Sequence, residues 1–209
     1  MQRVGLDESG KGDYFGPLVV AAVCANEEIE ERLKAMGVKD SKRLSDKRIL
    51  ELAVEIKRLC PNSVVTIGPK RYNQLYRQFR NLNRLLAWAH ARALENVLEP
   101  TRCELAIADQ FGDESFLLNA LMEKGRQVRL EQRHRAEEET VVAAASILAR
   151  AEFVEQIQEL SVLAGIELPK GASNPSIISV GKSIFEKGGV PALEEVAKLH
   201  FKITDAICE

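Results

Sequence analysis

The sequence predicts an α/β domain in which helices flank a mixed five-stranded sheet. Two apolar segments follow one another closely at the N-terminus, and later apolar segments alternate with stretches of helical periodicity. From about residue 165 to residue 209 the pattern is helical, which predicts a C-terminal helical appendage. No internal repeat, low-complexity tract or linker-like segment divides the 209 residues, so we expect a single domain, residues 1–209.

The first part of the chain predicts three strands and two helices. A glycine-rich turn at 7–17 separates the first two strands, and the second strand, LVVAAV, is continuously apolar, as in a buried strand. Asn26 and Ser45 are typical N-caps of two helices, of which the first ends at Gly37 and the second before Pro61. The three strands are expected at 1–7, 18–23 and 63–68.

The rest of the chain predicts two more strands and a series of helices. The longest helix is expected at 72–98, because apolar residues step by three or four throughout it and Pro100 follows. The two strands are expected at 104–109 and 127–131. The remaining helices are expected at 114–124 and from Thr140, Pro175 and Pro191 onward.

The composition excludes several classes of protein. The chain is 45% hydrophobic and 29% charged, which excludes an intrinsically disordered chain. No apolar run approaches the roughly 18 residues of a membrane span, and the opening MQRVGLDESG lacks the layout of a signal peptide. The four cysteines have no paired spacing, which indicates free thiols in a reducing compartment. We therefore expect a cytoplasmic protein that does not contact a membrane.

Two adjacent acids, Asp7 and Glu8, stand at the end of the first predicted strand. Neighbouring side chains of a regular strand point to opposite faces, so the two carboxylates converge only where the strand becomes irregular. Glycines at positions 10, 12 and 16 permit that distortion and allow a phosphate to approach the backbone closely. The alternative is a pair of solvated acids in an exposed turn.

Further acids occur at Asp109, at the end of an apolar strand, and at 137–139, just before a predicted helix. Each has an ordinary alternative, because an aspartate often caps a turn and acids complement the dipole at a helix N-terminus. Four such carboxylates could nevertheless hold two Mg²⁺ ions, since oxygen ligands suit hard cations. Two ions of this kind could activate a water and stabilise the leaving oxygen in phosphodiester hydrolysis. The few histidines, His90, His134 and His200, have no zinc-type spacing.

The near balance of 29 basic and 31 acidic residues hides an uneven distribution. Six lysines and arginines and no acid occur between positions 70 and 92, and Arg77, Arg80 and Arg84 would form a stripe on one helix face. Tyrosines and Trp88 lie nearby, as in a track for a phosphate backbone, although a solvated helix face is the alternative. A second basic cluster in a loop contains Lys39, Lys42 and Arg43.

Taken together, these segments resemble the type 2 ribonucleases H, and ribonuclease HIII more closely than ribonuclease HII. VGLDESGKGDYFGPLVVAAV resembles the first two strands of that family, with ESGKG in the HIII form. VKDSKRLSD resembles a loop common to both types. The resemblance continues through YNQLYRQFRNLNRLLAWAHARALENVL, IADQF, RAEEETVVAAASILAR, LPKGAS and VAKLHF, and covers nearly the whole chain.

The resemblance implies an RNase H-like fold and endonucleolytic cleavage of the RNA strand of RNA/DNA hybrids, leaving 3′-hydroxyl and 5′-phosphate ends. It implies dependence on Mg²⁺ or Mn²⁺, with two ions held by Asp7, Glu8, Asp109 and a fourth carboxylate. Matching the RAE triplet assigns the fourth carboxylate to Glu137. The spacing to Ser146 is one residue shorter than the family pattern, which leaves Glu138 and Glu139 as alternatives.

The resemblance also implies contacts to the hybrid. The GKG turn would lie in the minor groove and sense a 2′-hydroxyl, while Lys42 and the region of Arg80 and Arg84 would hold phosphates. The implied nucleic-acid contacts are Ser9, Gly10, Lys11, Gly12, Ser41, Lys42, Arg80, Asn83 and Arg84. No obligate protein partner is implied, so we expect a monomer.

One departure from the family pattern bears on substrate binding. Ribonuclease HIII proteins usually carry an N-terminal substrate-binding domain, whereas the catalytic strand here is expected from residue 2. We therefore expect weaker and more salt-sensitive hybrid binding than in a longer relative. An HII-like enzyme that incises at single ribonucleotides in DNA, or a nonenzymatic hybrid-binding module, are the alternatives.

Overall fold

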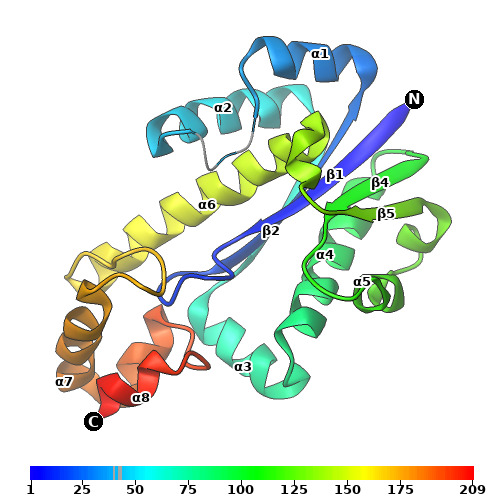
Figure 1. Ribbon diagram of the computed structural model, residues 1–209. Coiled ribbons are helices and arrows are strands. Elements are labelled where there is room, and N and C mark those ends of the chain that lie inside the picture. The colour runs from blue at the N-terminus through cyan, green and yellow to red at the C-terminus, as the bar shows by residue number, and fades with distance from the viewer. Residues whose placement is uncertain (40, 42–43) are drawn as a thin grey trace. The chain divides into compact units, whose positions relative to one another are not determined.

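The computed structural model describes residues 1–39, 41 and 44–209. Its five strands form one sheet in the order β3-β2-β1-β4-β5 (Figure 1). β1 is parallel to β4, and β4 to β5, whereas the short turn between β1 and β2 allows only an antiparallel pair. The mixed sheet confirms the predicted fold class. The strands are β1 (Gln2–Ser9), β2 (Leu18–Asn26), β3 (Asn62–Ile67), β4 (Leu105–Asp109) and β5 (Arg129–Arg133).

Several predicted helix signals act as expected. The side chains of Asn26 and Ser45 accept hydrogen bonds from backbone N–H groups in the first turns of α1 and α2. The helices α7 and α8 confirm the predicted C-terminal helical segment. In the described part of the chain, no helix has both the length and the apolar character to cross a bilayer. The helices are α1 (Glu27–Ala35), α2 (Asp46–Leu59), α3 (Pro69–Phe79), α4 (Leu82–Leu98), α5 (Glu114–Ala120), α6 (Thr140–Ala164), α7 (Ser176–Val196) and α8 (Ile203–Cys208), with 3₁₀ turns η2 (Gly125–Gln127) and η3 (Ala136–Glu138).

The chain divides into two compact units. The first unit holds most of the sheet and the helices α1, α2, α4 and α5, and the second holds α3, α7 and α8. The first unit consists of Met1–Glu8, Val20–Val65 and Asn81–Ala151, and the second of Ser9–Val19, Thr66–Arg80 and Glu152–Glu209. The expectation of a single domain for residues 1–209 stays a prediction.

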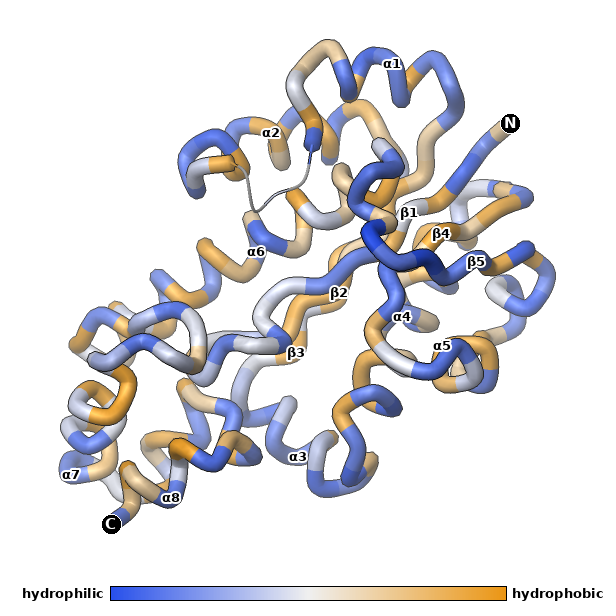
Figure 2. The backbone as a smooth tube through the Cα atoms, in the orientation of Figure 1, coloured by the Kyte–Doolittle hydropathy of each residue, from blue (hydrophilic) through white to orange (hydrophobic). Residues whose placement is uncertain are grey.

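The core of the first unit is formed where α6 lies directly against the sheet. The strand β2 is buried over almost its whole length, and the tube in Figure 2 is mainly orange there. At Gly5 in β1, a Cβ atom would lie 2.2 Å from the backbone carbon of Val141 in α6. Since real Cβ atoms do not approach other atoms so closely, only glycine allows this contact between strand and helix.

The prediction of one long helix at 72–98 is wrong. The chain forms two helices, because Arg80 adopts the left-handed conformation, with φ 51° and ψ 20°, and ends α3. Asn81 then accepts a hydrogen bond from the backbone N–H of Arg84 and starts α4. Apolar periodicity continues across this break, and it concealed the N-cap signal of Asn81.

Other boundaries differ by a few residues. The predicted helix at 114–124 ends earlier, at Ala120, and the last strand extends beyond its predicted end to Arg133. The start expected at Pro191 corresponds to the second part of α7, after an interruption at Gly188 and Gly189 with non-helical dihedral angles. The short helix α8 lies within the predicted helical segment, but no separate start was predicted for it.

Candidate active site

The first unit brings Asp7 and Asp109 to the ends of two neighbouring strands. In the parallel pair of β1 and β4, Leu6 is opposite Ala108, so the next positions in register are those of the two aspartates. Both lie at the carboxyl ends of their strands, where open α/β sheets place ligand-contacting residues. The Oδ1 atom of Asp109 accepts a hydrogen bond of 3.0 Å from the backbone N–H of Ala136, just before Glu137.

The Asp7 carboxylate lies in a partly buried and acidic environment. Burial, and next the charge of Glu8, raise its pKa to about 7, and the charge of Asp109 acts in the same direction. Hydrogen bonds from Ser146 and from the backbone N–H of Glu8, the latter 2.8 Å long, act in the opposite direction. A carboxylate that is costly to ionise without a cation is typical of a functional site.

The raised pKa of Asp7 predicts how stability depends on pH in metal-free protein. The pKa of Asp7 in the folded state lies above the ordinary value of 3.8, so ionising Asp7 destabilises the fold. The metal-free protein therefore loses stability as pH rises from about 4 to 7. Asp7→Asn removes this cost and keeps the acceptor for the N–H of Glu8. We expect the metal-free variant to be more stable than wild type by about 1–2 kcal/mol at pH 8, and by less at pH 5. Urea denaturation in EDTA at both pH values measures this difference, and an advantage that does not grow with pH would contradict the prediction.

The Glu8 carboxylate is held by a histidine that the sequence analysis set aside. His90 in α4 is fully buried, and its Nε2 atom lies 3.0 Å from Oε2 of Glu8. An ionised carboxylate only accepts hydrogen bonds, so Nε2 carries the proton. The His90 ring also lies 4.9 Å from the ring of Phe111, two residues beyond Asp109. His90 therefore contacts both Glu8, near the end of β1, and Phe111, in the segment that follows Asp109 at the end of β4.

The Nδ1 atom of His90 has no hydrogen-bond partner among the described residues, although it is buried. An unpaired buried nitrogen costs about 1–3 kcal/mol, which must be offset by a benefit elsewhere. The sequence signal was present: His90 occurs among apolar residues on α4, and a polar group in such a position needs a partner. Zinc-type spacing does not reveal His90, because its partner is a carboxylate on another element.

Removing the His90 side chain's polar groups is expected to weaken divalent-metal binding. In His90→Phe, Glu8 loses its donor and is no longer oriented, so we expect Mn²⁺ affinity to fall about 10- to 100-fold. Isothermal titration of Mn²⁺ into the protein measures this. The control is His134→Phe, at an exposed position. Equal affinities in both variants would show that His90 does not position Glu8.

The three acids before α6 have different environments. Glu139 is held by two arginines, with Oε1 2.5 Å from Nη1 of Arg133 and Oε2 3.1 Å from Nη1 of Arg3. Glu137 and Glu138 belong to η3, where Glu137 is partly buried and Glu138 is exposed. Both line a cavity of about 580 Å³ together with lysines and an arginine. Ion pairs with Arg133 and Arg3 thus account for the position of Glu139.

The donor set suits a hard divalent cation. Asp7, Glu8 and Asp109 offer oxygen atoms only, and the electrostatic cost of ionising Asp7 beside the other two would fall when a cation binds. In the described part of the chain, no three or more acidic, histidine or cysteine side chains are arranged with metal-ligand geometry. Each of these carboxylates instead accepts a hydrogen bond from the protein. Such a bond does not prevent a carboxylate from also ligating a cation.

The predicted nucleic-acid contacts fall into different parts of the structure. Ser9, Gly10, Lys11 and Gly12 belong to the second unit, whereas Ser41 belongs to the first and is buried. The Oγ atom of Ser41 lies 2.8 Å from Oγ of Ser146, the residue that hydrogen-bonds Asp7. Lys42 and Arg43 lie outside the described residues.

The prediction that Arg77, Arg80 and Arg84 form a basic stripe on one helix is wrong. The break at Arg80 separates Arg77 in α3 from Arg84 in α4, so the three arginines do not share one helix face. Acids from α7 also neutralise part of the cluster, with Lys70 2.5 Å from Glu195 and Arg77 2.8 Å from Glu194. Arg80 and Arg84 remain exposed. Asn83 lies against the backbone at Gly112, where a Cβ atom would be 2.8 Å from its Nδ2.

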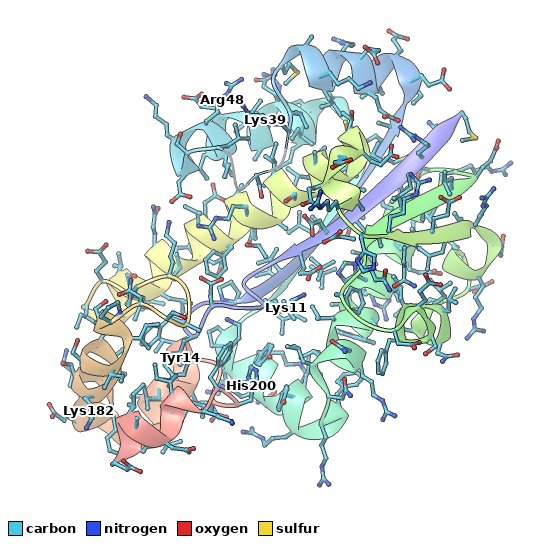
Figure 3. The ribbon with its side chains drawn as sticks, viewed as in Figure 1. Lys11, Tyr14, Lys39, Arg48, Lys182 and His200 are labelled. Atoms are coloured by element: carbon cyan, nitrogen blue, oxygen red, sulfur yellow. The ribbon has the colours of Figure 1, made fainter. Side chains whose placement is uncertain are left out.

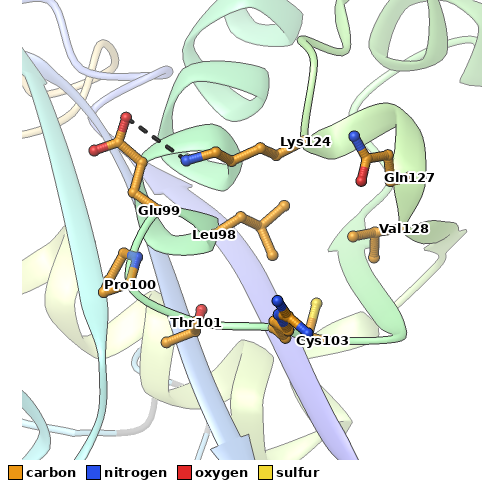
Figure 4. A pocket seen from close by; sticks show the side chains of 9 residues that line it. Leu98, Glu99, Pro100, Thr101, Cys103, Lys124, Gln127 and Val128 are labelled. Atoms are coloured by element: carbon orange, nitrogen blue, oxygen red, sulfur yellow. Dashed lines mark ion pairs between the residues drawn. The ribbon is translucent and has the colours of Figure 1, made fainter.

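A second large cavity of the first unit lies away from the carboxylates (Figure 4). It has a volume of about 580 Å³ and is lined by the chain around Leu98 to Cys103 and around Lys124 to Val128, with Lys124 4.0 Å from Glu99. These segments precede β4 and β5, whereas Asp109 ends β4. The cavity is therefore at the opposite ends of the strands from the acids, and it contributes nothing to their chemistry.

The family to which the chain belongs follows from a comparison with protein-family models. The model for ribonuclease HII matches residues 4–204. The chain belongs to the ribonuclease HII family. Within this family, the chain is 48% identical to ribonuclease HIII of Protochlamydia amoebophila over 205 residues, which cover 98% of the chain and 68% of the relative. It is 47% identical to ribonuclease HIII of Chlamydia pneumoniae, covering 99% of the chain and 70% of that relative.

A solved structure of the family agrees with the fold. The crystal structure of Bst-RNase HIII in complex with Mn²⁺ superimposes with a TM-score of 0.91 at 34% identity. The match covers 99% of the chain and 69% of that structure. The resemblance to ribonuclease HIII expected from the sequence motifs is thereby confirmed.

Proposed function

We propose that the chain is an endoribonuclease that hydrolyses the RNA strand of RNA/DNA hybrids and leaves 5′-phosphate and 3′-hydroxyl ends. The observation that carries the proposal is the position of Asp7 and Asp109 at the carboxyl ends of adjacent parallel strands, with Glu8 beside them. Three carboxylates in such proximity repel one another and are suited to a shared cation. Membership of the ribonuclease HII family supports the same conclusion.

The catalytic carboxylates in this proposal are Asp7, Glu8, Asp109 and Glu137. Among the three acids before α6, Glu139 is paired with two arginines and Glu138 is exposed, which favours Glu137 as the fourth carboxylate. Asp109 accepts a hydrogen bond from Ala136, the residue before Glu137, and so ties this segment to the end of β4.

The cofactor in this proposal is a pair of Mg²⁺ or Mn²⁺ ions. When bound, such ions activate a water and stabilise the leaving oxygen of the scissile phosphodiester. The protein's contribution is to fix the ligands: Ser146 and the backbone N–H of Glu8 orient Asp7, His90 orients Glu8, and the N–H of Ala136 orients Asp109. A relative of known structure was crystallised with Mn²⁺.

Substrate contact is proposed for the glycine-rich turn of the second unit, for the exposed Arg80 and Arg84 with Asn83 beside them in the sequence, and for the segment of Ser41 and Lys42. At Gly12 no described atom lies within 4 Å of a Cβ position, so the fold itself does not require glycine there. The open space at this position leaves room for a molecule to approach the backbone, which fits contact with a nucleic acid. The proposed contacts are Ser9, Gly10, Lys11, Gly12, Ser41, Lys42, Arg80, Asn83 and Arg84.

We further propose that residues 1–209 act as one catalytic domain, as a monomer and in the cytoplasm. An HII-like enzyme that incises at single ribonucleotides in DNA is the second candidate, because the matching family model describes ribonuclease HII.

The experiment that tests the function compares cleavage of three labelled duplexes: an RNA/DNA hybrid, a DNA duplex with four ribonucleotides and one with a single ribonucleotide. Each is incubated with the protein in Mg²⁺, in Mn²⁺ and in EDTA. Cleavage of the first two duplexes that requires metal supports the proposal. Preferential incision of the single-ribonucleotide duplex would favour the second candidate, and binding without cleavage in either metal would indicate a nonenzymatic module.

A further inference from the structure

The second unit contains a buried cation for which the proposed reaction has no role. Lys198, in the short segment between α7 and α8, has no solvent-exposed surface. Burial lowers the pKa of its ammonium group to about 7. Because burying an ammonium group is costly, its retention requires strong compensating contacts.

Three hydrogen bonds donated by Lys198 lead to the glycine-rich turn after β1. Its Nζ atom donates hydrogen bonds to the backbone oxygens of Asp13, at 2.8 Å, and Gly16, at 2.6 Å. Its backbone N–H donates to the oxygen of Tyr14 at 2.9 Å. One lysine therefore holds three residues of the turn, Asp13, Tyr14 and Gly16, by hydrogen bonds to their main-chain oxygens.

The conformation that these bonds stabilise depends on two glycines. Gly10 and Gly16 have φ angles of 84° and 86°, in the left-handed region. At Gly10 a Cβ atom would lie 2.1 Å from the oxygen of Pro17. Glycine adopts these angles without strain, so the two glycines permit this shape of the turn, and the hydrogen bonds from Lys198 hold the turn in it.

The segment that carries Lys198 is itself held rigidly. The side chain of Asn73 in α3 donates to the oxygen of Ala197 at 2.9 Å and accepts from the N–H of Leu199 at 2.9 Å. A second connection from the turn leads to Gly171, whose N–H donates to Oδ1 of Asp13 at 2.6 Å. Lys198 thus links the turn to a segment that is itself held in place by hydrogen bonds with Asn73.

We propose that Lys198 is a positioning residue that fixes residues 10–12 in the geometry in which they contact the RNA/DNA hybrid, and so determines substrate discrimination. This inference rests on the proposed function, because it assigns the turn to substrate contact. Lys198 does not touch the substrate: it acts through the carbonyls of Asp13 and Gly16. Its loss is therefore expected to affect substrate binding and selectivity and to leave metal binding intact.

The test compares Lys198→Met, Lys198→Arg and the control Lys182→Met. Methionine resembles the apolar part of the lysine side chain but cannot donate a hydrogen bond, whereas arginine keeps the charge and N–H donors. Lys182 is an exposed lysine of α7 in the same unit (Figure 3, which also labels Lys11 and Tyr14 of the turn), so its variant controls for the loss of one positive charge. For each full-length variant, kcat and KM on hybrid and DNA duplexes, Mn²⁺ affinity by titration, and amide hydrogen exchange are measured.

For Lys198→Met we expect KM on the hybrid to rise about 10- to 100-fold, because displacement of a positioning element by about 1 Å has effects of this size. We also expect the preference for hybrid over DNA duplex to fall, and amide exchange at residues 10–16 to accelerate. Mn²⁺ affinity should stay within about twofold of wild type, and Lys182→Met should match wild type in all measurements. Lys198→Arg should show the same changes to a smaller degree.

Two results would overturn the inference. One is faster exchange in the turn with unchanged KM and selectivity in Lys198→Met. The other is a Lys198→Met protein that does not fold, together with a Lys198→Arg protein that equals wild type, since this means a purely structural role. Absence of cleavage by wild type itself would instead refute the proposed function, and the exchange data would still report whether Lys198 holds the turn.

Discussion

Asp109→Asn is expected to lower the rate of hybrid cleavage by about a thousandfold, which corresponds to ~4 kcal/mol of activation free energy. Asparagine retains the oxygen that accepts the N–H of Ala136, so the end of β4 keeps its conformation. It lacks the negative charge by which this position would hold a divalent cation. The loss should therefore appear in kcat and in Mn²⁺ affinity, while affinity for the hybrid stays close to wild type.

The structure supplies a matched control for this variant. Asp113 also accepts a backbone N–H bond through Oδ1, from Ser115 at 2.9 Å, but it caps α5 on the exposed surface. Asp113→Asn changes the same charge and keeps the same kind of acceptor. We expect it to retain wild-type cleavage. If Asp109→Asn still cuts the hybrid in Mg²⁺ at a rate similar to Asp113→Asn, the proposed metal site is wrong.

The second large effect is expected for alanine substitutions of Gly12 and Gly10, in the turn after β1, which should change hybrid affinity and stability respectively. Gly12→Ala adds a methyl group where no described atom lies within 4 Å, so the free energy of unfolding should change by less than about 1 kcal/mol. The same methyl group would stand between the backbone and an approaching nucleic acid. We therefore expect hybrid affinity to fall about tenfold or more, ~1.4 kcal/mol, without loss of stability.

Gly10→Ala should have the opposite profile. The φ angle of 84° disfavours alanine, and the added Cβ would lie 2.1 Å from the oxygen of Pro17 and 2.8 Å from the ring of Phe153. We expect a loss of stability of more than about 2 kcal/mol, visible as a lower melting temperature. Thermal unfolding and fluorescence anisotropy with a labelled hybrid separate the two effects. Equal loss of stability in both variants would refute the assignment of Gly12 to substrate contact.

Much of the sheet could be predicted because its signals are local. The continuous apolar run of β2 and the apolar segment that ends at Asp109 both form strands where expected. Asn26 and Ser45 act as N-caps for the same reason, since a cap requires only a polar side chain next to the first helical turn. The order of the strands is not local information, and it was not predicted; the resemblance implied only the RNase H-like fold.

Most of the features that were mispredicted or missed depend on contacts that are distant in sequence, whereas the break at Arg80 is local. The left-handed conformation of Arg80 ends α3 although the apolar periodicity of the sequence continues past it. The acids that neutralise Lys70 and Arg77 are more than a hundred residues away, in α7. His90 was missed because its partner, Glu8, lies in another element. Spacing rules detect groups that share one element, and a buried pair formed by a helix and a strand does not follow them.

The contact between Gly5 and Val141 determines which substitutions the protein tolerates at position 5. Gly5 bears no functional group, yet any side chain at this position would push β1 and α6 apart. Asp7 lies on β1, and Ser146, which hydrogen-bonds it, lies on α6. A single added carbon atom would separate an acid from its hydrogen-bond donor. Loss of function at this position would arise without any alteration of the catalytic residues, and a screen based on activity alone would wrongly count Gly5 among them.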